Sequence, residues 1–260
     1  MNTYTLAEGK DEELLFILTY ASYSEQEELL LVPDNFAEII IPISEKKIEL
    51  RIIGTKKQLT VNRGSIYFLP PRRRGMEVSF EKETQFAIIK LNPIYTKVIA
   101  NNLTEVCTGV YDCEASDKMS FQLRLGVNLR DLRAVSGWIS THLLRGQEED
   151  KINSTIEESI SRIKDTGGSI KIKELYTNLN ISKSKLEKHF NSELQMTPKE
   201  FCKIEKINRF IKSYHNRYGQ NLTELTYKCG YYDQSHLIKD FKYFLDTSPK
   251  RYFAKANDSC

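Results

Sequence analysis

The last ninety or so residues contain a tandem repeat, which constrains the fold of this chain more than any other feature. The segment LEKHF at 186–190 is followed by TPKEF at 197–201, and LIKDF at 237–241 is followed by SPKRY at 248–252. Both pairs of segments are offset by 51 residues, without a gap. Self-similarity at a fixed spacing predicts two copies of one supersecondary unit.

A second pair of similar segments lies upstream, at a slightly different offset. IKEL at 172–175 is similar to LTEL at 222–225, with an offset of 50 residues. The change by one residue falls between two apolar helical patterns, where a helix-turn-helix has its turn. The repeat therefore predicts two helix-turn-helix units.

Turn and capping residues support both units. Asn180 and Gly230 stand where the turn needs a left-handed backbone, which glycine adopts easily and asparagine tolerates. Ser182 and Asp233 follow as N-caps of the second helix of each unit.

Each second helix has apolar residues at i, i+4 and i+8, which leaves its other face free. Lysine on that face suits phosphates and guanine, and glutamine suits adenine. Tyr231 and Tyr232 offer further hydroxyl groups. The polar candidates for contacts with DNA are Ser182, Lys183, Ser184, Glu187 and Lys188 in the first unit, and Gln234, Ser235, His236 and Lys239 in the second.

Residues 169–254 resemble the DNA-binding domain of AraC-type transcription regulators. The resemblance is carried by GYYDQSHLIKDF at 230–241 and SPKRY at 248–252. It implies two helix-turn-helix subdomains joined by a long helix at 198–214, with both recognition helices in successive major-groove segments. By position it also implies base-facing roles for Ser184, Glu187 and Lys188, and for Gln234, Ser235, Ile238 and Lys239.

Three positions depart from this family's pattern. Gln195 and Asp246 stand where the family usually has glycine before the S/T-P segment, and glutamine tolerates a left-handed backbone less well than aspartate. Glu187 on the first recognition helix repels phosphate unless it meets a cytosine amine. We therefore expect the first unit to contribute less to sequence choice than the second, or to need help from a second subunit.

Charge is distributed unevenly along the chain. Residues 169–260 have 17 Lys and Arg and 10 Asp and Glu, a net charge of +7, whereas the preceding 168 residues have a net charge of −4. Basic charge concentrated in one part of the chain favours a polyanionic partner there. Double-stranded promoter DNA is thus the expected partner of this part.

The first ninety residues have the pattern of an all-β domain. Short segments rich in Ile, Leu and Val are separated by turn signals, which predicts a sandwich or small barrel. The expected strands are Glu28–Val32, Ala37–Pro42, Ile48–Ile53, Ser65–Leu69, Val78–Phe80 and Phe86–Leu91.

Helical patterns follow Pro93. One amphipathic helix is expected over Asn128–Arg145, and another carries Ile152, Ile156, Ile160 and Ile163. Asn153-Ser154 would start this second helix and Gly167-Gly168 would end it. The expected class is α+β multidomain, with a β-rich sensor or dimerisation domain at 1–167 and an all-α double helix-turn-helix domain at 168–260.

The N-terminal half also resembles the cupin-like sensor domains of AraC-type regulators, through LVPD at 31–34 and FAIIKLNP at 86–93. Such a domain implies a small-molecule effector, a homodimer, or both, and the family implies contact with RNA polymerase as an activator. A protein partner acting on an interaction module is the alternative. A barrel cavity with converging polar groups would favour the effector, and close-packed Ile and Leu would favour the partner.

The sequence gives no indication of catalysis, a metal site or a cofactor. None of the four histidines precedes residue 142, so a histidine-ligated metal in the barrel is excluded. Five cysteines without a C-x-x-C pair are expected to be reduced thiols, and Cys229 to pack as a small apolar residue. No apolar run is long enough for a membrane helix, and the cytoplasm is the expected compartment.

A run of three arginines, PPRRRG at 70–75, lies outside the basic C-terminal part. A solvated loop is the ordinary interpretation of such a run. The alternative is a contact with an anion, either an acidic effector or a DNA phosphate.

Overall fold

The computed structural model describes most of the chain. The described residues are 2–10, 13–22, 27–56, 58–63, 66–106, 119–121, 134, 137–143, 153–215 and 222–258.

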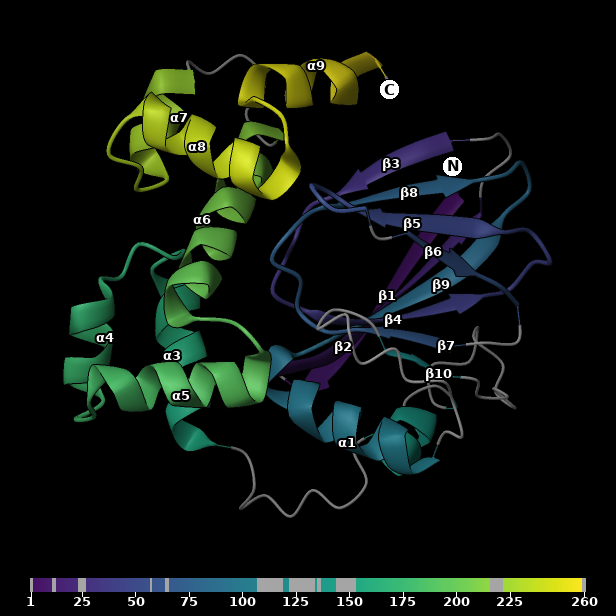
Figure 1. The fold of residues 1–260 in the computed structure, drawn as a ribbon, viewed down its shortest axis with the longest axis horizontal. Helices are drawn as coiled ribbons and strands as arrows, with labels where there is room; N and C mark the ends of the chain where they lie inside the picture. The colour runs from purple at the N-terminus through teal and green to yellow at the C-terminus, as the bar shows by residue number, and fades with distance from the viewer. Residues whose placement is uncertain are drawn as a thin grey trace.

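The N-terminal half contains two antiparallel sheets (Figure 1). The six-stranded sheet has the order β1-β2-β9-β4-β7-β10, and the four-stranded sheet has the order β3-β8-β5-β6. The strands are β1 Asn2–Lys10, β2 Glu13–Ser22, β3 Glu27–Leu31, β4 Ala37–Pro42, β5 Ile48–Ile52, β6 Gln58–Val61, β7 Ile66–Leu69, β8 Met76–Phe80, β9 Gln85–Leu91 and β10 Met119–Phe121.

Strand β4 shows why the six-stranded sheet lies at the centre of this domain. All six of its residues are buried, because apolar side chains cover both faces of the sheet. Ile40 packs into the core between the two sheets, whereas Ile39 and Ile41 belong to the cluster on the opposite face. By contrast, β5 alternates buried and exposed residues, as expected for a strand with one solvent-exposed face.

Helices cover the outer face of the six-stranded sheet. The 3-10 helix η1 at Pro93–Tyr95 leads into α1 at Thr96–Val106, and Ile99 and Trp138 join the cluster there. A π-helical turn, η2, spans Ile139–Leu143 and contacts α1.

The C-terminal part is helical. The elements are α3 Ser154–Asp165, α4 Ile172–Asn178, α5 Lys183–Leu194, α6 Pro198–His215, α7 Leu222–Lys228, α8 Gln234–Leu245 and α9 Pro249–Asp258. In Figure 1, α6 extends from α5 at one end to α7 and α8 at the other, and the helices lie beside the open ends of the sheets.

The predicted fold class is confirmed, with a two-sheet β domain followed by two helix-turn-helix units on a long helix. Each of the six predicted strands is present within two residues of its expected bounds, whereas β1, β2, β6 and β10 were not predicted individually. Most of the helix expected over Asn128–Arg145 lies outside the described residues, and its described end contains η2. None of the helices in the described ranges is both long and apolar enough to cross a membrane.

Candidate nucleic-acid interface

The turn of each unit has a left-handed residue. Asn180 has φ 51° and Gly230 has φ 77°. A side chain at Gly230 would be strained by this backbone and would also place its Cβ 2.3 Å from Ser169 Oγ. The turn in the second unit therefore requires glycine.

An N-cap side chain starts each recognition helix. Ser182 Oγ accepts a hydrogen bond from Lys185 N at 3.2 Å, and Asp233 Oδ1 accepts one from His236 N at 2.7 Å. These bonds satisfy one otherwise free amide each and leave the other first-turn amides directed outward. Both helix N-termini thus suit phosphate oxygens.

The apolar stripe of each recognition helix is buried. Leu186, Phe190 and Leu194 of α5 are fully buried. Leu237, Phe241 and Leu245 of α8 are at most 2% exposed. Because one face of each helix is fixed in the core, the opposite face must point outward.

The candidate residues of the first unit lie on that outward face. Ser182, Lys183, Ser184 and Lys188 are exposed, and Glu187 is half-buried. Lys183 Nζ lies 3.6 Å from Glu187 Oε1, one helical turn away. The lysine therefore partly offsets the negative charge that would oppose DNA.

The second unit also presents its candidates to solvent. Ser235, His236 and Lys239 are exposed, and Ile238 is 37% exposed. Gln234 Nε2 donates to Thr223 Oγ1 at 2.5 Å, which orients the amide against α7. An adenine contact would therefore use an amide whose position is already restricted.

Two polar residues of the second unit are structural. Tyr231 is 3% exposed and its ring packs edge-on against Phe210, so the expectation that it offers a hydroxyl to DNA is wrong. Tyr232, in contrast, is 86% exposed. Asp240 is buried in α8 and forms an ion pair with Lys203 of α6 at 2.7 Å. This pair fixes the second recognition helix to the long helix.

Both recognition helices border one groove. Its volume is about 740 Å³, and its lining includes Lys183 and Glu187 of α5, His236 of α8, and Lys199, Lys203 and Lys206 of α6. Helix α6 has 18 residues, so it is about 27 Å long. The two recognition helices therefore border a groove lined by several lysines, and α6 connects the two units.

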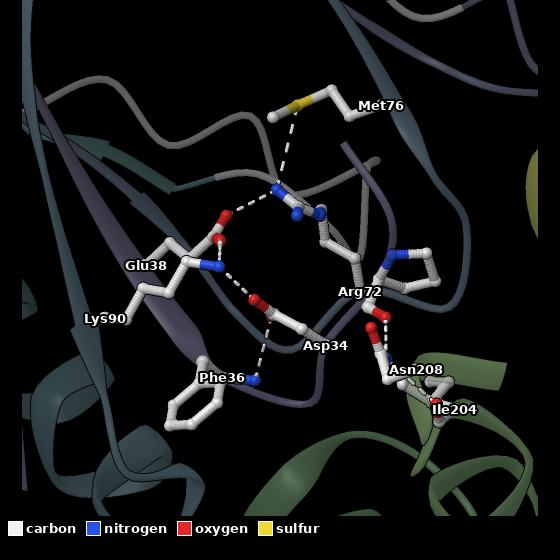
Figure 2. A network of polar contacts seen from close by, with 9 residues as sticks. Asp34, Phe36, Glu38, Arg72, Met76, Lys90, Ile204 and Asn208 are labelled. Carbon is white, nitrogen blue, oxygen red and sulfur yellow. Dashed lines mark hydrogen bonds and ion pairs between the residues drawn. The ribbon is translucent and has the colours of Figure 1, made fainter. Parts of the chain in front are cut away.

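The run of three arginines lies in the loop between β7 and β8. Arg72 is 6% exposed, so the expectation of a solvated loop is wrong for this residue. Its Nη1 contacts Glu38 Oε2 at 2.5 Å, while Lys90 contacts both Glu38 and Asp34 (Figure 2). These four residues, Asp34, Glu38, Arg72 and Lys90, form an ionic quartet in which Glu38 and Arg72 are buried and Asp34 and Lys90 are half-buried, without net charge when all are ionised.

The quartet shifts the pKa values of its acids in opposite directions. Burial, together with the charge of Glu38, raises the pKa of Asp34. Burial alone would also raise the pKa of Glu38, but Arg72 and Lys90 outweigh it and hold this pKa below its ordinary value. Glu38 is therefore the charged partner on which the buried Arg72 depends.

The two cysteines that the structure describes near this interface are not reactive thiols. Cys202 and Cys229 are free thiols and both are buried. Burial raises the pKa of Cys202 to about 12, which leaves it protonated at neutral pH. Cys229 is 1% exposed within the apolar core, which confirms its predicted packing.

Two capped helix pairs, each with an outward polar face and joined by one long helix, define a double helix-turn-helix domain, a class that binds double-stranded DNA. Residues 175–255 match the family model described as a helix-turn-helix domain. This segment is a helix-turn-helix domain of the AraC type.

Solved structures show the same fold over nearly the whole chain. ToxT from Vibrio cholerae O395 is 14% identical to this chain. The two structures match with a TM-score of 0.53 over 92% of this chain and 96% of ToxT. A second ToxT crystal form is 12% identical with a TM-score of 0.54, covering 91% and 97% of the two chains. ToxT bound to (E)-4-(8-methylnaphthalen-1-yl)but-3-enoic acid is 14% identical with a TM-score of 0.52, covering 91% and 97%. No curated protein sequence matches the chain.

Proposed function

We propose that this protein is a sequence-specific DNA-binding transcription regulator. The observation that carries the proposal is the pair of outward-facing recognition helices on either side of one lysine-lined groove. The N-terminal halves of α5 and α8 would enter successive major-groove segments on one side of a duplex. The phosphates between them would face the lysines of α6.

The ten residues predicted from the sequence are proposed as the DNA contacts. Lysines on both helices would neutralise phosphates or reach guanine, and Gln234 would pair with adenine. Ile238, partly exposed on α8, suits an apolar contact with a thymine methyl group. The set is Ser182, Lys183, Ser184, Glu187, Lys188, Gln234, Ser235, His236, Ile238 and Lys239.

The first test is selection of duplexes from a random-sequence pool by the purified full-length protein, followed by titration of a selected duplex at several salt concentrations. Lys239→Ala should weaken binding by roughly fivefold or more, because a lost contact of about 1 kcal/mol has this effect. The slope of log affinity against log salt should fall by about 1 if Lys239 contacts a phosphate.

Lys82→Ala is the matched control, since Lys82 is exposed on the β8–β9 turn. It removes the same charge from the β domain and should leave affinity and slope nearly unchanged. Equal values for Lys239→Ala and Lys82→Ala would reject the Lys239 contact. Failure of the wild-type protein to enrich any sequence would reject the proposed function.

We propose that the N-terminal domain controls DNA binding through a small-molecule effector. The support is the shared fold with ToxT, which has been solved with a bound aryl-butenoic acid. The same acid is a suitable first probe, and a raised melting temperature together with changed operator affinity would be the expected result. No change in either quantity would reject this acid as an effector.

A protein partner is the second candidate, and the β-domain interior is the observation that favours it. Ten buried residues, among them Ile48, Leu50 and Phe80, form an apolar cluster between the sheets, and the charged side chains beside it, Glu38 and Arg72, pair with each other. Close apolar packing suits an interaction module better than a ligand cavity. A homodimer and contact with RNA polymerase as an activator are also proposed, and are tested by sedimentation and by in-vitro transcription from a selected promoter.

A further inference from the structure

The loop Arg72–Gly75, here called the arginine loop, contacts the ends of both recognition helices. Arg73 donates to Gln195 O at 2.6 Å and lies 3.6 Å from Glu200 Oε1. Gln195 is the C-cap of α5, and Glu200 is in the first turn of α6. Arg73 therefore holds the end of the first recognition helix.

The next two residues of the loop hold the second recognition helix. Arg74 donates to the carbonyl oxygen of Tyr243, in the last turn of α8, and its guanidinium lies 4.0 Å from the centre of the Tyr243 ring. Gly75 N donates to Phe244 O at 2.7 Å. A Cβ on Gly75 would lie 2.9 Å from Leu245 Cδ2. A larger residue at this position would therefore clash with α8 unless the loop moved away.

Arginine is well suited to these contacts. The last carbonyls of a helix have no partner within the helix and carry the negative end of its dipole. A guanidinium satisfies such oxygens with a fixed set of donors and can also stack on an aromatic ring. The two arginines thus satisfy carbonyl oxygens at the C-terminal ends of both recognition helices.

The arginine loop is also held within the β domain. Arg72 is buried and paired with Glu38 in the ionic quartet. The segment before β4 also contacts α6, because Asn208 donates to Pro33 O at 2.6 Å and Asn35 donates to Phe201 O at 3.0 Å. The arginine loop is therefore attached to the β domain through a buried ion pair.

The contacts leave the proposed DNA faces free. They involve the C-terminal ends of α5 and α8, which face the β sheets in Figure 1, and the first turn of α6. Lys183 and Lys188 of α5, and Ser235 and Lys239 of α8, remain exposed. The loop is thus a support for the recognition helices and does not cover them.

We propose that Arg73 and Arg74 are positioning residues that set the separation and orientation of the two recognition helices. Adjacent residues of one loop hold two helices from different units, so the β domain fixes their relative position. This inference rests on the proposed DNA binding. Its consequence is that the protein should discriminate strongly between duplexes that differ only in the spacing of the two contacted segments.

The test uses the full-length protein and a duplex of about 30 base pairs selected by the wild type, long enough for two major-groove contacts. A series of duplexes carries insertions of up to about five base pairs, roughly half a turn, between the two contacted segments. The wild type should lose affinity steeply along this series. Arg73→Ala/Arg74→Ala should bind the parent duplex roughly tenfold more weakly and should lose much less affinity on insertion.

The matched control is Arg51→Ala/Arg63→Ala. These arginines are exposed, and among the described residues they pair within the β domain, with Glu77 and Glu45. The control removes the same charge, so it separates positioning from general electrostatic attraction. Arg73→Lys/Arg74→Lys keeps the charge but not the planar guanidinium, and should recover overall affinity more than spacing selectivity.

The outcomes are distinguishable. If the wild type binds with strong spacing selectivity and Arg73→Ala/Arg74→Ala has the same spacing profile as the control, the positioning role is wrong and the proposed function stands. If the wild type selects no duplex, the proposed function itself fails. Circular dichroism of each variant verifies folding, and if the alanine variant does not fold, the lysine variant provides the same comparison of spacing profiles.

Discussion

At the scale of single residues, the buried pair of Arg72 and Glu38 makes the sharpest stability prediction. Arg72→Met should lower the free energy of unfolding by about 3 kcal/mol, because it leaves Glu38 buried with only Lys90 to balance it. Urea denaturation measures this loss.

Arg51→Met is the corresponding exposed control, since Arg51 and Glu77 form an ion pair at the surface. It should cost less than about 1 kcal/mol. Adding Glu38→Leu to Arg72→Met should restore most of the lost stability, because the unpaired buried charge is then gone. Equal losses for the two single variants would contradict the role of burial.

Residue identity alone predicted the caps better than it predicted burial. A cap depends on neighbours three residues away, so Ser182 and Asp233 could be recognised locally. Whether Arg72 is solvated, or Tyr231 exposed, depends on residues far along the chain. Arg72 pairs with Glu38 of β4, 34 positions earlier in the chain, and Tyr231 packs on Phe210 of α6.

At the scale of elements, the residue that ends each recognition helix has a left-handed backbone, a conformation that side chains other than glycine rarely adopt. Gln195 has φ 55° and Asp246 has φ 50°, both left-handed, at positions where the family usually has glycine. Gln195→Gly should raise the free energy of unfolding by about 0.5–1 kcal/mol, and Asp246→Gly should raise it less, because aspartate tolerates this backbone better.

The midpoints of urea denaturation compare the two variants. Gln195→Gly keeps the carbonyl that accepts from Arg73, so the gain should not depend on that contact. A lower midpoint for Gln195→Gly, or a larger gain for Asp246→Gly, would contradict the assignment of backbone strain.

The helices were more predictable from the sequence than the strands for a physical reason. A helix-turn-helix is specified by local spacing, and α6 at Pro198–His215 extends one residue beyond the expected 198–214. Strand β6 has four residues, and β10 has three, which is too short for an alternating pattern. Strand β2 has a long apolar run, LLFILTYA, whose periodicity does not separate strand from buried helix.

At the scale of the whole molecule, the contacts between the β domain and the helices could not be predicted from the sequence. Asn35 and Phe201 are 166 positions apart, and Arg74 and Tyr243 are 169 apart. The boundary at Gly167-Gly168 stays a prediction, and α3 before it contacts both α5 and α6. The fold class could be predicted from local sequence patterns, whereas the contacts between the two domains could be identified only in the tertiary structure.

The two helix-turn-helix units are expected to contribute unequally to DNA recognition. Glu187 reduces the positive potential of the first recognition helix, although Lys183 at 3.6 Å partly offsets it. The second recognition helix has no acidic residue on its exposed face over Gln234–Lys239, and Asp240 is neutralised by Lys203. Sequence choice should therefore depend mainly on α8.

Lys188→Ala and Lys239→Ala test this asymmetry, because each removes one exposed lysine from equivalent positions of α5 and α8. On a duplex selected by the wild type, Lys239→Ala should weaken binding by roughly fivefold or more and Lys188→Ala by less, since the charge of Glu187 already weakens the first contact. The selected sequences should show stronger base preferences in the segment that the second unit contacts. Larger effects of Lys188→Ala, with stronger preferences in the other segment, would assign the dominant role to the first unit and would mean that Glu187 reads a cytosine amine.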